Sequence, residues 1–396
     1  MHLATYPDVN PPYLFPAYDS TVLRAPGEPL IEAPADWVSQ SPGPDSRRIP
    51  VPADGADLLR HHAGEPIGER IVIDGRVLDS DGQPVPGALV EIWQTNAAGI
   101  YEDPSDPGFF PHDPNFTGAG RCLTSADGRF RFRTVKPGAY PQAPGQIYRP
   151  SHIHFSVFGP TLGSRLITQC YFEGDPLIGR DPIARAASRG LPRLIARLDP
   201  EATQSEGSQS ALTYRYDITL RGPGATAARN GRPGQVANPS QTIGPRYGYA
   251  LMFDGSEQAV SPAEPGAVEI RGVVLDGHGQ TVAYPDAMLE FWAPGQFARA
   301  RTGTDGEYRA VLRKPPASRL PGGQLQAPHL NVAIFARGLL KQAQARLYFP
   351  DEEQVNAVDP VLGLVPPARR PTLIARHGLR FDIRLQGPGE TAFFAF

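Results

Sequence analysis

His152 and His154 are the residues whose types and spacing most directly suggest chemistry, and they lie in the segment YRPSHIHF at 148–155. Side chains alternate along a β-strand, so both imidazoles point to one face while Ile153 and Phe155 point to the other. Pro150 suits the entrance of such a strand. Two imidazoles on one face of a rigid strand can provide two ligands of a metal site. Such pairs also occur on surface strands without metal, so the pair alone leaves both interpretations open.

Two tyrosines accompany the histidines. Tyr101 follows Gly99 just after the expected strand at 88–93, and Tyr140 follows the segment KPG at 136–138. Phenolate is a hard anionic ligand, and a bound cation lowers the pKa of a phenol far below its usual value of about 10. Two phenolates and one hydroxide would neutralise a ferric ion inside an apolar sandwich. The chain has 14 tyrosines, so either one alone could be a loop aromatic that covers the core. Together, the four residues indicate one Fe(III) per chain.

The composition is that of a folded protein with many turns. Of the 396 residues, 40% are hydrophobic and 20% are charged, which is typical of a globular chain of two or three domains. The 45 prolines and 42 glycines are spread between short apolar runs, which favours short strands joined by turns. The net charge is −3, and the sequence contains no long run of basic residues. We therefore expect neither a nucleic-acid nor a membrane partner.

The sequence offers no disulfide framework, because Cys122 and Cys170 are its only cysteines. The first residues, 1–18, lack the basic and apolar regions of a signal peptide. No segment is long enough and apolar enough to span a membrane. We therefore expect a cytoplasmic protein.

Short strands dominate the pattern from residue 69 onward. We expect a hairpin over 121–133 around the turn at 125–128, and one helix over 182–198. Residues 1–70 are Pro-rich and irregular, which indicates an arm that wraps over another part of the molecule. Besides the histidine strand, strands are predicted at 70–78, 88–93, 166–172 and 213–220.

The pattern then repeats. The segments IRGVVLD (270–276), LEFW (289–292), TDGEYR (304–309) and PHLNV (328–332) correspond to IDGRVLD (73–79), VEIW (90–93), ADGRFR (126–131) and the histidine strand. This is an internal duplication of one all-β domain. The second copy has Asn331 in place of His154 and no tyrosine in place of Tyr140. One copy is therefore predicted to carry the site and the other only its scaffold.

The expected organisation is an all-β protein with two tandem β-sandwiches. Residues 1–70 form the arm, and residues 71–221 form the iron-binding sandwich. Residues 222–240 form a linker rich in Gly, Ala, Arg, Asn and Pro. Residues 241–396 form a second sandwich without metal.

Specific motifs carry a family resemblance. Residues 74–183 contain DPNF (113–116), GRCLT (120–124), KPG (136–138), RPSHIHF (149–155) and YFEGDPLI (171–178). This part resembles the iron-binding β subunits of the protocatechuate 3,4-dioxygenase family, whose members cleave catechol rings between the two hydroxylated carbons. From PSQT (239–242) to the end, ARG (336–338), RLYF (346–349) and FDIRLQG (381–387) resemble the metal-free α subunits. The chain therefore looks like a β–α fusion of two intradiol-dioxygenase-type sandwiches.

The resemblance implies a role for each matching residue. Tyr101, Tyr140, His152 and His154 match the four iron ligands, with Tyr140 and His154 axial. Tyr140 matches the ligand that leaves when substrate binds, and Arg149 matches an active-site arginine. The implied substrate pocket takes Tyr18, Gln142, Gln169 and Ile183 from the β-like part and Thr242, Gly244, Pro245 and Arg337 from the α-like part.

The implied reaction is cleavage of protocatechuate by O₂ to 3-carboxy-cis,cis-muconate in a homo-oligomeric enzyme. Arg337 is the candidate partner of the substrate carboxylate, although an arginine there could equally be a surface residue. Gln142 stands where the family's β subunits commonly have tryptophan, which changes the pocket and leaves 4-sulfocatechol open as a substrate. Catechol and hydroxyquinol dioxygenases are further alternatives, but they carry a helical N-terminal segment that residues 1–70 do not resemble. A non-catalytic β-sandwich binding module is the alternative from another class.

Overall fold

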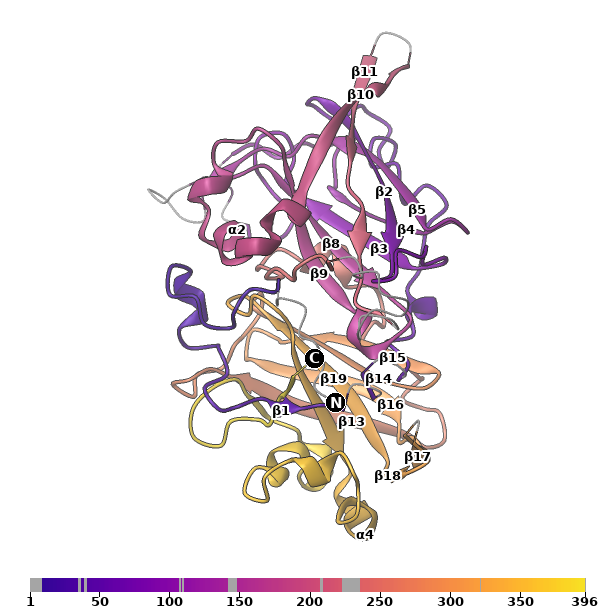
Figure 1. Cartoon of the computed structure of the whole chain (residues 1–396), viewed down its shortest axis with the longest axis vertical. Coiled ribbons are helices and arrows are strands. Elements are labelled where there is room, and N and C mark those ends of the chain that lie inside the picture. Colours follow the sequence, from indigo (N-terminus) through magenta and orange to yellow (C-terminus); the bar gives the residue numbers. More distant parts are fainter. Residues whose placement is uncertain are drawn as a thin grey trace.

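Two β-sandwiches follow one another along the chain and pack against each other (Figure 1). The computed structural model describes residues 9–395 apart from 35–36, 39–40, 107, 109, 142–147, 207–208, 223–235 and 321. The prediction of an all-β protein is confirmed. The described helices are short, such as α2 (Pro182–Ala186), α3 (Gly248–Leu251) and α4 (Glu353–Asn356). None of the helices in these residues is long and apolar enough to cross a bilayer.

The nine strands of the first sandwich form one continuously hydrogen-bonded sheet, which folds over to make both faces of the sandwich. Strand β10 pairs in parallel with β9 through Ile195 and Ala196, and antiparallel with β11 from Arg197 onward. It therefore links the two faces of the sandwich. The strands are β2 (Arg70–Leu78), β3 (Leu89–Gln94), β4 (Ala119–Leu123), β5 (Arg129–Val135), β8 (His152–Phe158), β9 (Leu166–Phe172), β10 (Ile195–Glu206), β11 (Gln209–Arg215) and β12 (Ile218–Thr219).

The second sandwich repeats this plan with a six-stranded and a three-stranded sheet. Its six-stranded sheet includes β1 (Ile31–Glu32), which comes from the N-terminal arm and pairs in parallel with β22 at the other end of the chain. The arm thus crosses from the first sandwich to the second, as Figure 1 shows in indigo. The other strands are β13 (Ala267–Leu275), β14 (Ala287–Ala293), β15 (Gln296–Arg301), β16 (Glu307–Arg313), β17 (Ser318–Arg319), β18 (Leu325–Gln326), β19 (His329–Ala336), β20 (Ala343–Tyr348), β21 (Ile383–Arg384) and β22 (Phe394–Ala395).

Two sequence predictions about local structure are wrong. The turn at 125–128 forms, with the Gly128 amide donating to the Ser125 carbonyl at 2.9 Å, but its flanking strands do not pair as a hairpin. Strand β4 pairs with β3, whereas β5 pairs with β2. The helix expected over 182–198 ends at Ala186, and a 3₁₀ segment and strand β10 follow it. Gly190 and Pro192 lie in that segment, and both disfavour a continued α-helix.

Four buried charged residues join the two sandwiches. Arg299 of β15 lies 2.9 Å from the Glu91 carboxylate of β3 and 3.0 Å from that of Glu290 on β14. Arg165, just before β9, approaches Glu290 at 2.9 Å. Each half thus supplies one carboxylate and one guanidinium. Burial opposes the charge of Glu91, but the guanidinium groups of Arg299 and Arg121 hold its pKa below the usual value. Its stabilising contribution is therefore present at neutral pH and lost as the pH falls through that lowered value.

Replacing Arg299 by methionine is expected to destabilise the protein strongly. The change leaves Glu91 and Glu290 buried without their shared partner, which costs about 3–5 kcal/mol in the free energy of unfolding. Denaturant unfolding at neutral pH measures this cost. Arg309→Met is the matched control, because Arg309 is half-exposed and its ion pairs are 3.4 and 3.9 Å long, so it should lose at most about 1 kcal/mol. Equal losses in both variants would contradict the role of the buried network.

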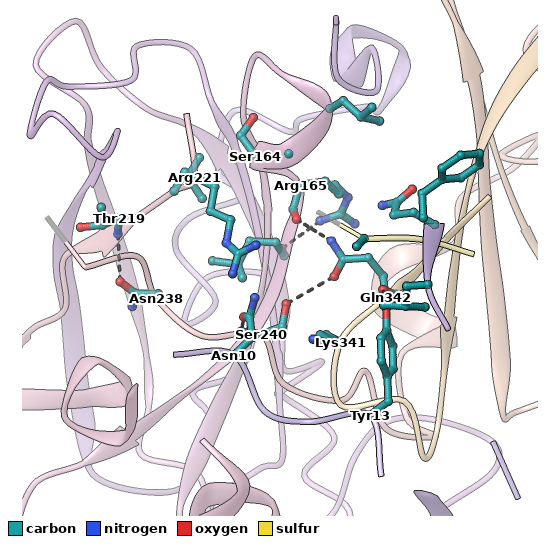
Figure 2. Close-up of a pocket in the computed structure, with 18 residues that line it drawn as sticks. Asn10, Tyr13, Ser164, Arg165, Thr219, Arg221, Asn238, Ser240, Lys341 and Gln342 are labelled. Atoms are coloured by element: carbon teal, nitrogen blue, oxygen red, sulfur yellow. Dashed lines mark hydrogen bonds between the residues drawn. The ribbon is translucent and has the colours of Figure 1, made fainter. Parts of the chain in front are cut away.

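The junction of the two halves also contains a cavity of about 190 Å³, seen in Figure 2. Gln342 spans it, because its side chain donates to the Arg165 carbonyl at 2.8 Å and accepts from the Ser240 hydroxyl at 3.3 Å. Asn238 accepts from the backbone amide of Thr219 at 2.9 Å. Most of the predicted linker lies outside the described residues. Its last part, represented by Asn238 and Ser240, is buried and bonded to both sandwiches.

Candidate metal centre and substrate cavity

Strand β8 presents His152 and His154 on one face, as the alternation along a strand predicts. Their neighbours Ile153 and Phe155 belong to the apolar core of the first sandwich. The His154 ring stacks on Trp93 of the neighbouring strand β3, with ring centroids 4.6 Å apart and planes 8° apart. Both histidines are almost fully buried. Stacking on Trp93 therefore fixes the His154 ring before any ligand arrives.

The protonation of the histidines suits metal binding. The Nδ1 of His152 lies 2.7 Å from the Pro150 carbonyl, which only accepts, so Nδ1 carries the proton and Nε2 holds a lone pair. In the described part of the chain, Nε2 of His152 and Nδ1 of His154 are buried without hydrogen-bond partners. Burial and the nearby Arg149 hold the pKa of both rings well below the usual value. Neutral imidazoles with unpaired buried nitrogens are expected of metal ligands.

Tyr101 and Tyr140 lie beside each other and next to the two histidines. Their hydroxyl oxygens are 3.3 Å apart and their rings are perpendicular. The Tyr140 ring centroid lies 5.7 Å from that of His152, and the Tyr101 centroid lies 6.3 Å from that of His154. Burial and the adjacent Tyr140 raise the pKa of Tyr101 well above its usual value. A buried phenol of this kind ionises only when a cation lies beside it.

Local hydrogen bonds bring the two tyrosine loops together. The Asn96 side chain accepts from the amides of Ala98 and Ile100 at 2.9 and 3.1 Å, which folds the turn before Tyr101. The Gly138 amide donates to the Asn96 carbonyl at 2.9 Å, so the loop before Tyr140 lies on that turn. Gly138 has no space for a side chain, because a Cβ there would lie 2.5 Å from the Ala97 carbonyl oxygen.

The donor set fits a hard trivalent cation. Two neutral imidazoles lie beside two adjacent phenols, and iron accepts both nitrogen and hard oxygen ligands. Among the described residues, no group of three or more His, Cys, Asp or Glu side chains could hold a metal. A metal at this point would therefore depend on the phenol oxygens.

The second sandwich preserves half of the arrangement. His329 corresponds to His152, with its Nδ1 2.8 Å from the Ala327 carbonyl and its ring 5.8 Å from that of Tyr348. The ring of His152 has the same 5.8 Å spacing from Tyr171. At the next inward position, Asn331 replaces the imidazole of His154. The second copy thus keeps the framework of the site without its ligand set.

Arg149 is buried in a hydrogen-bond network next to the candidate metal site. One terminal nitrogen of its guanidinium donates to the Asp181 carboxylate at 2.9 Å and to the Gln169 side chain at 2.6 Å. Asp181 also caps helix α2 by accepting from the amides of Ile183 and Ala184. Burial opposes the charge of Arg149, but Asp181 raises its pKa well above the ordinary value, so the group stays charged. The first sandwich therefore holds a fixed positive charge near the histidines.

A cavity opens onto this site and is lined by residues from the arm and from both sandwiches. Most residues of the predicted pocket line it, and Gln169 lies behind Arg149 and also donates to the Thr242 carbonyl at 3.2 Å. Gln142 lies outside the described residues. The predicted residues that line the cavity are Tyr18, Tyr101, Tyr140, Arg149, His154, Ile183, Thr242, Gly244, Pro245 and Arg337.

The second sandwich contributes a wall next to His154. A Cβ built on Gly244 would lie 3.7 Å from Cε1 of His154, and the φ of +70° at Gly244 favours glycine. Arg337 follows strand β19, and 43% of its side chain is exposed. The α-like half thus reaches His154 at the edge of the candidate metal site and adds a cation to the cavity.

Sequence reasoning missed several residues of this cavity, among them one pair of charged side chains. Arg246 and Asp106 line it, with Nε of Arg246 3.6 Å from the Asp106 carboxylate. Asp106 also accepts from the backbone amide of Tyr101 at 3.2 Å, so it helps to place that tyrosine. The pair lies far apart in sequence and no motif joins its members. The position of Arg246, directly after Gly244 and Pro245, was the available signal.

Comparison with known proteins identifies the family. Profiles described as Dioxygenase and as Protocatechuate 3,4-dioxygenase beta subunit N terminal match residues 43–222 and 6–35. The protocatechuate 3,4-dioxygenase beta chain of Burkholderia cepacia is 48% identical over 221 residues, which cover 55% of this chain and 92% of that one. The chain belongs to the protocatechuate 3,4-dioxygenase family of intradiol dioxygenases.

The chain also resembles the alpha chain of protocatechuate 3,4-dioxygenase. The protocatechuate 3,4-dioxygenase alpha chain of B. cepacia is 39% identical over 192 residues, covering 39% of this chain and 95% of that one. Catechol 1,2-dioxygenase 1 of Acinetobacter lwoffii is 39% identical over 204 residues, which cover 47% of this chain and 60% of that one. The protein is thus an intradiol dioxygenase, an oxidoreductase, with β-like and α-like parts in one chain. The alternative of a non-catalytic binding module is excluded.

Proposed function

We propose that this intradiol dioxygenase cleaves protocatechuate with O₂ to give 3-carboxy-cis,cis-muconate. The proposal includes one Fe(III) per chain, held by Tyr101, Tyr140, His152 and His154. It also includes the division of the chain into an arm, a catalytic sandwich, a linker and a metal-free sandwich. The relatives' names, alpha chain and beta chain, indicate subunits that assemble, so a homo-oligomer of the fused chain completes the proposal.

The chemistry is divided between the metal and the protein. When bound by these four residues, ferric iron would supply the Lewis acidity that favours the deprotonated catechol and makes its ring reactive toward O₂. Tyr140 is only half-buried, and as the phenolate that a bound ferric ion would stabilise, its oxygen could accept a hydroxyl proton from the incoming substrate and become a neutral phenol. Arg149 remains charged because Asp181 is 2.9 Å away, so it favours the anionic form of the bound catechol.

The observation that carries the choice of protocatechuate is the guanidinium of Arg337 in the cavity wall. Its carboxylate neighbour Asp286 is 3.9 Å away, beyond hydrogen-bond distance. A half-exposed guanidinium with a loose partner is suited to a substrate carboxylate. Its position on the α-like half also gives that half a direct part in substrate selection.

Replacing Arg337 by alanine tests this function. Loss of a charge-assisted contact of about 1.5–3 kcal/mol should raise KM for protocatechuate about 10- to 100-fold. KM for unsubstituted catechol, which has no carboxylate, should change little. Iron content and the visible absorption should stay as in the wild-type protein. O₂ uptake with both substrates measures the difference, and equal losses for the two would refute the carboxylate contact.

A sulfonated catechol is the second candidate substrate, because Arg246 adds another guanidinium to the cavity. Its Nη1 donates to the Ser105 hydroxyl at 2.9 Å, and its side chain is 18% exposed. Two cations on one wall suit a strongly acidic substituent. Including 4-sulfocatechol in the O₂-uptake measurements decides between the two substrates by their kcat/KM values.

A further inference from the structure

The N-terminal arm lies directly on the turn that carries Arg337. Arg24 donates through Nη1 to the Arg337 carbonyl, and its Nη2 lies 2.7 Å from the Asp286 carboxylate. Gly338 has a φ of +95°, and a Cβ there would lie 3.0 Å from Cδ of Arg24 and would overlap the Ser20 carbonyl. The arm therefore packs against the backbone of this turn with no space left for a side chain.

Asp286 stands between two guanidinium groups. Its carbonyl accepts from the Arg337 amide at 2.9 Å, which holds the two residues side by side at the ends of strands β14 and β19. Its carboxylate lies 2.7 Å from Arg24 but 3.9 Å from Arg337. The side chains of Arg24 and Asp286 are 18% and 17% exposed, whereas that of Arg337 is 43% exposed. The more buried pair is thus the closer one.

This geometry makes the two arginines competitors for one carboxylate. A carboxylate with a bonded guanidinium at 2.7 Å has less attraction left for a second cation. If Arg24 lost its charge, Arg337 would be the remaining guanidinium within 4 Å of Asp286 among the described residues. A tight Asp286–Arg337 pair would neutralise the cation that faces the cavity.

We propose that Arg24 is a positioning residue that holds Asp286 and thereby keeps Arg337 available to the anionic group of the substrate. The proposal rests on the proposed function, in which Arg337 binds that group. It gives the arm a role in substrate selection besides the contribution of Tyr18 to the cavity. Arg24 itself does not line the cavity among the described residues, so its effect passes through Asp286.

The test is a set of three variants of the full-length protein assayed by O₂ uptake. Arg24→Gln should raise KM for protocatechuate about tenfold, the lower end of what a charge-assisted contact contributes. It should leave kcat and the KM for catechol nearly unchanged. Asp286→Asn should leave KM for protocatechuate at or below the wild-type value. The double variant should return to near the wild-type KM, because no carboxylate remains to capture Arg337.

Arg47→Gln is the matched control, since Arg47 is also an arm arginine and its ion pair with Asp45 is exposed. It should change neither KM. Failure of the double variant to recover, or an equal loss for catechol in Arg24→Gln, would overturn the proposal and reduce Arg24 to a structural contact.

Calorimetric measurement of ligand binding separates this inference from the proposed function. The two ligands are 4-hydroxybenzoate, which has a carboxylate, and phenol, which has none. If the wild-type protein does not cleave protocatechuate, the proposed function fails. The Arg24 proposal then stands only if Arg24→Gln weakens binding of 4-hydroxybenzoate alone and the double variant restores it, and any other binding pattern overturns it.

Discussion

Replacing His154 by asparagine is expected to remove the iron and abolish ring cleavage. The change converts a buried neutral imidazole into an amide, which is a weak ligand, and it reproduces the Asn331 position of the second sandwich. The loss of iron affinity and activity should exceed the roughly 10–100-fold loss caused by changes to residues that only support metal ligands. Elemental analysis of iron per chain, the visible phenolate-to-iron absorption and O₂ uptake measure the three consequences.

His329→Asn is the matched control for this experiment. His329 makes the same backbone contact as His152, at 2.8 and 2.7 Å respectively, but belongs to the second sandwich. This variant should keep one iron per chain, the colour and the activity. Loss of iron in His329→Asn, or full iron in His154→Asn, would show that the metal lies elsewhere.

The sequence predicted the parts of this protein that depend on short-range patterns. Alternation along 152–158 placed both histidines on one face and Ile153 and Phe155 in the core, as the structure has them. The repeated segments predicted a second sandwich, and β14 and β19 form there as β3 and β8 form in the first. These features depend on side-chain period and local turn chemistry, which a single sequence records.

The features that the sequence did not predict correctly depend on contacts between residues far apart in the chain. The turn at 125–128 is correctly located, but the choice of β2 and β3 as strand partners is made by the packing of the sandwich. Asp106 and Arg246 become neighbours only because the second sandwich packs on the first. The Arg24–Asp286 pair joins residues 262 positions apart. No local period or motif encodes such pairs.

Replacing Arg149 by methionine is expected to lower kcat about 10²- to 10³-fold, the range for loss of one preorganised stabilising group. Iron should remain, because Arg149 is not among the four proposed ligands. The same change leaves Asp181 buried without its guanidinium, although helix α2 still donates two amides to it. The free energy of unfolding should therefore also fall, which would confuse a structural loss with a chemical one.

The double variant Arg149→Met with Asp181→Asn separates the two effects. The asparagine carries no charge and removes the stranded carboxylate, and its single carbonyl oxygen can still accept from one of the amides of Ile183 and Ala184, which Asp181 accepts with separate oxygens. Stability measured by denaturant unfolding should recover in large part, while kcat at saturating substrate should stay low. Recovery of both quantities would mean that Arg149 serves only to balance Asp181. Recovery of stability alone would assign its positive charge to the reaction, because the surrounding fold is then intact and only the guanidinium is missing.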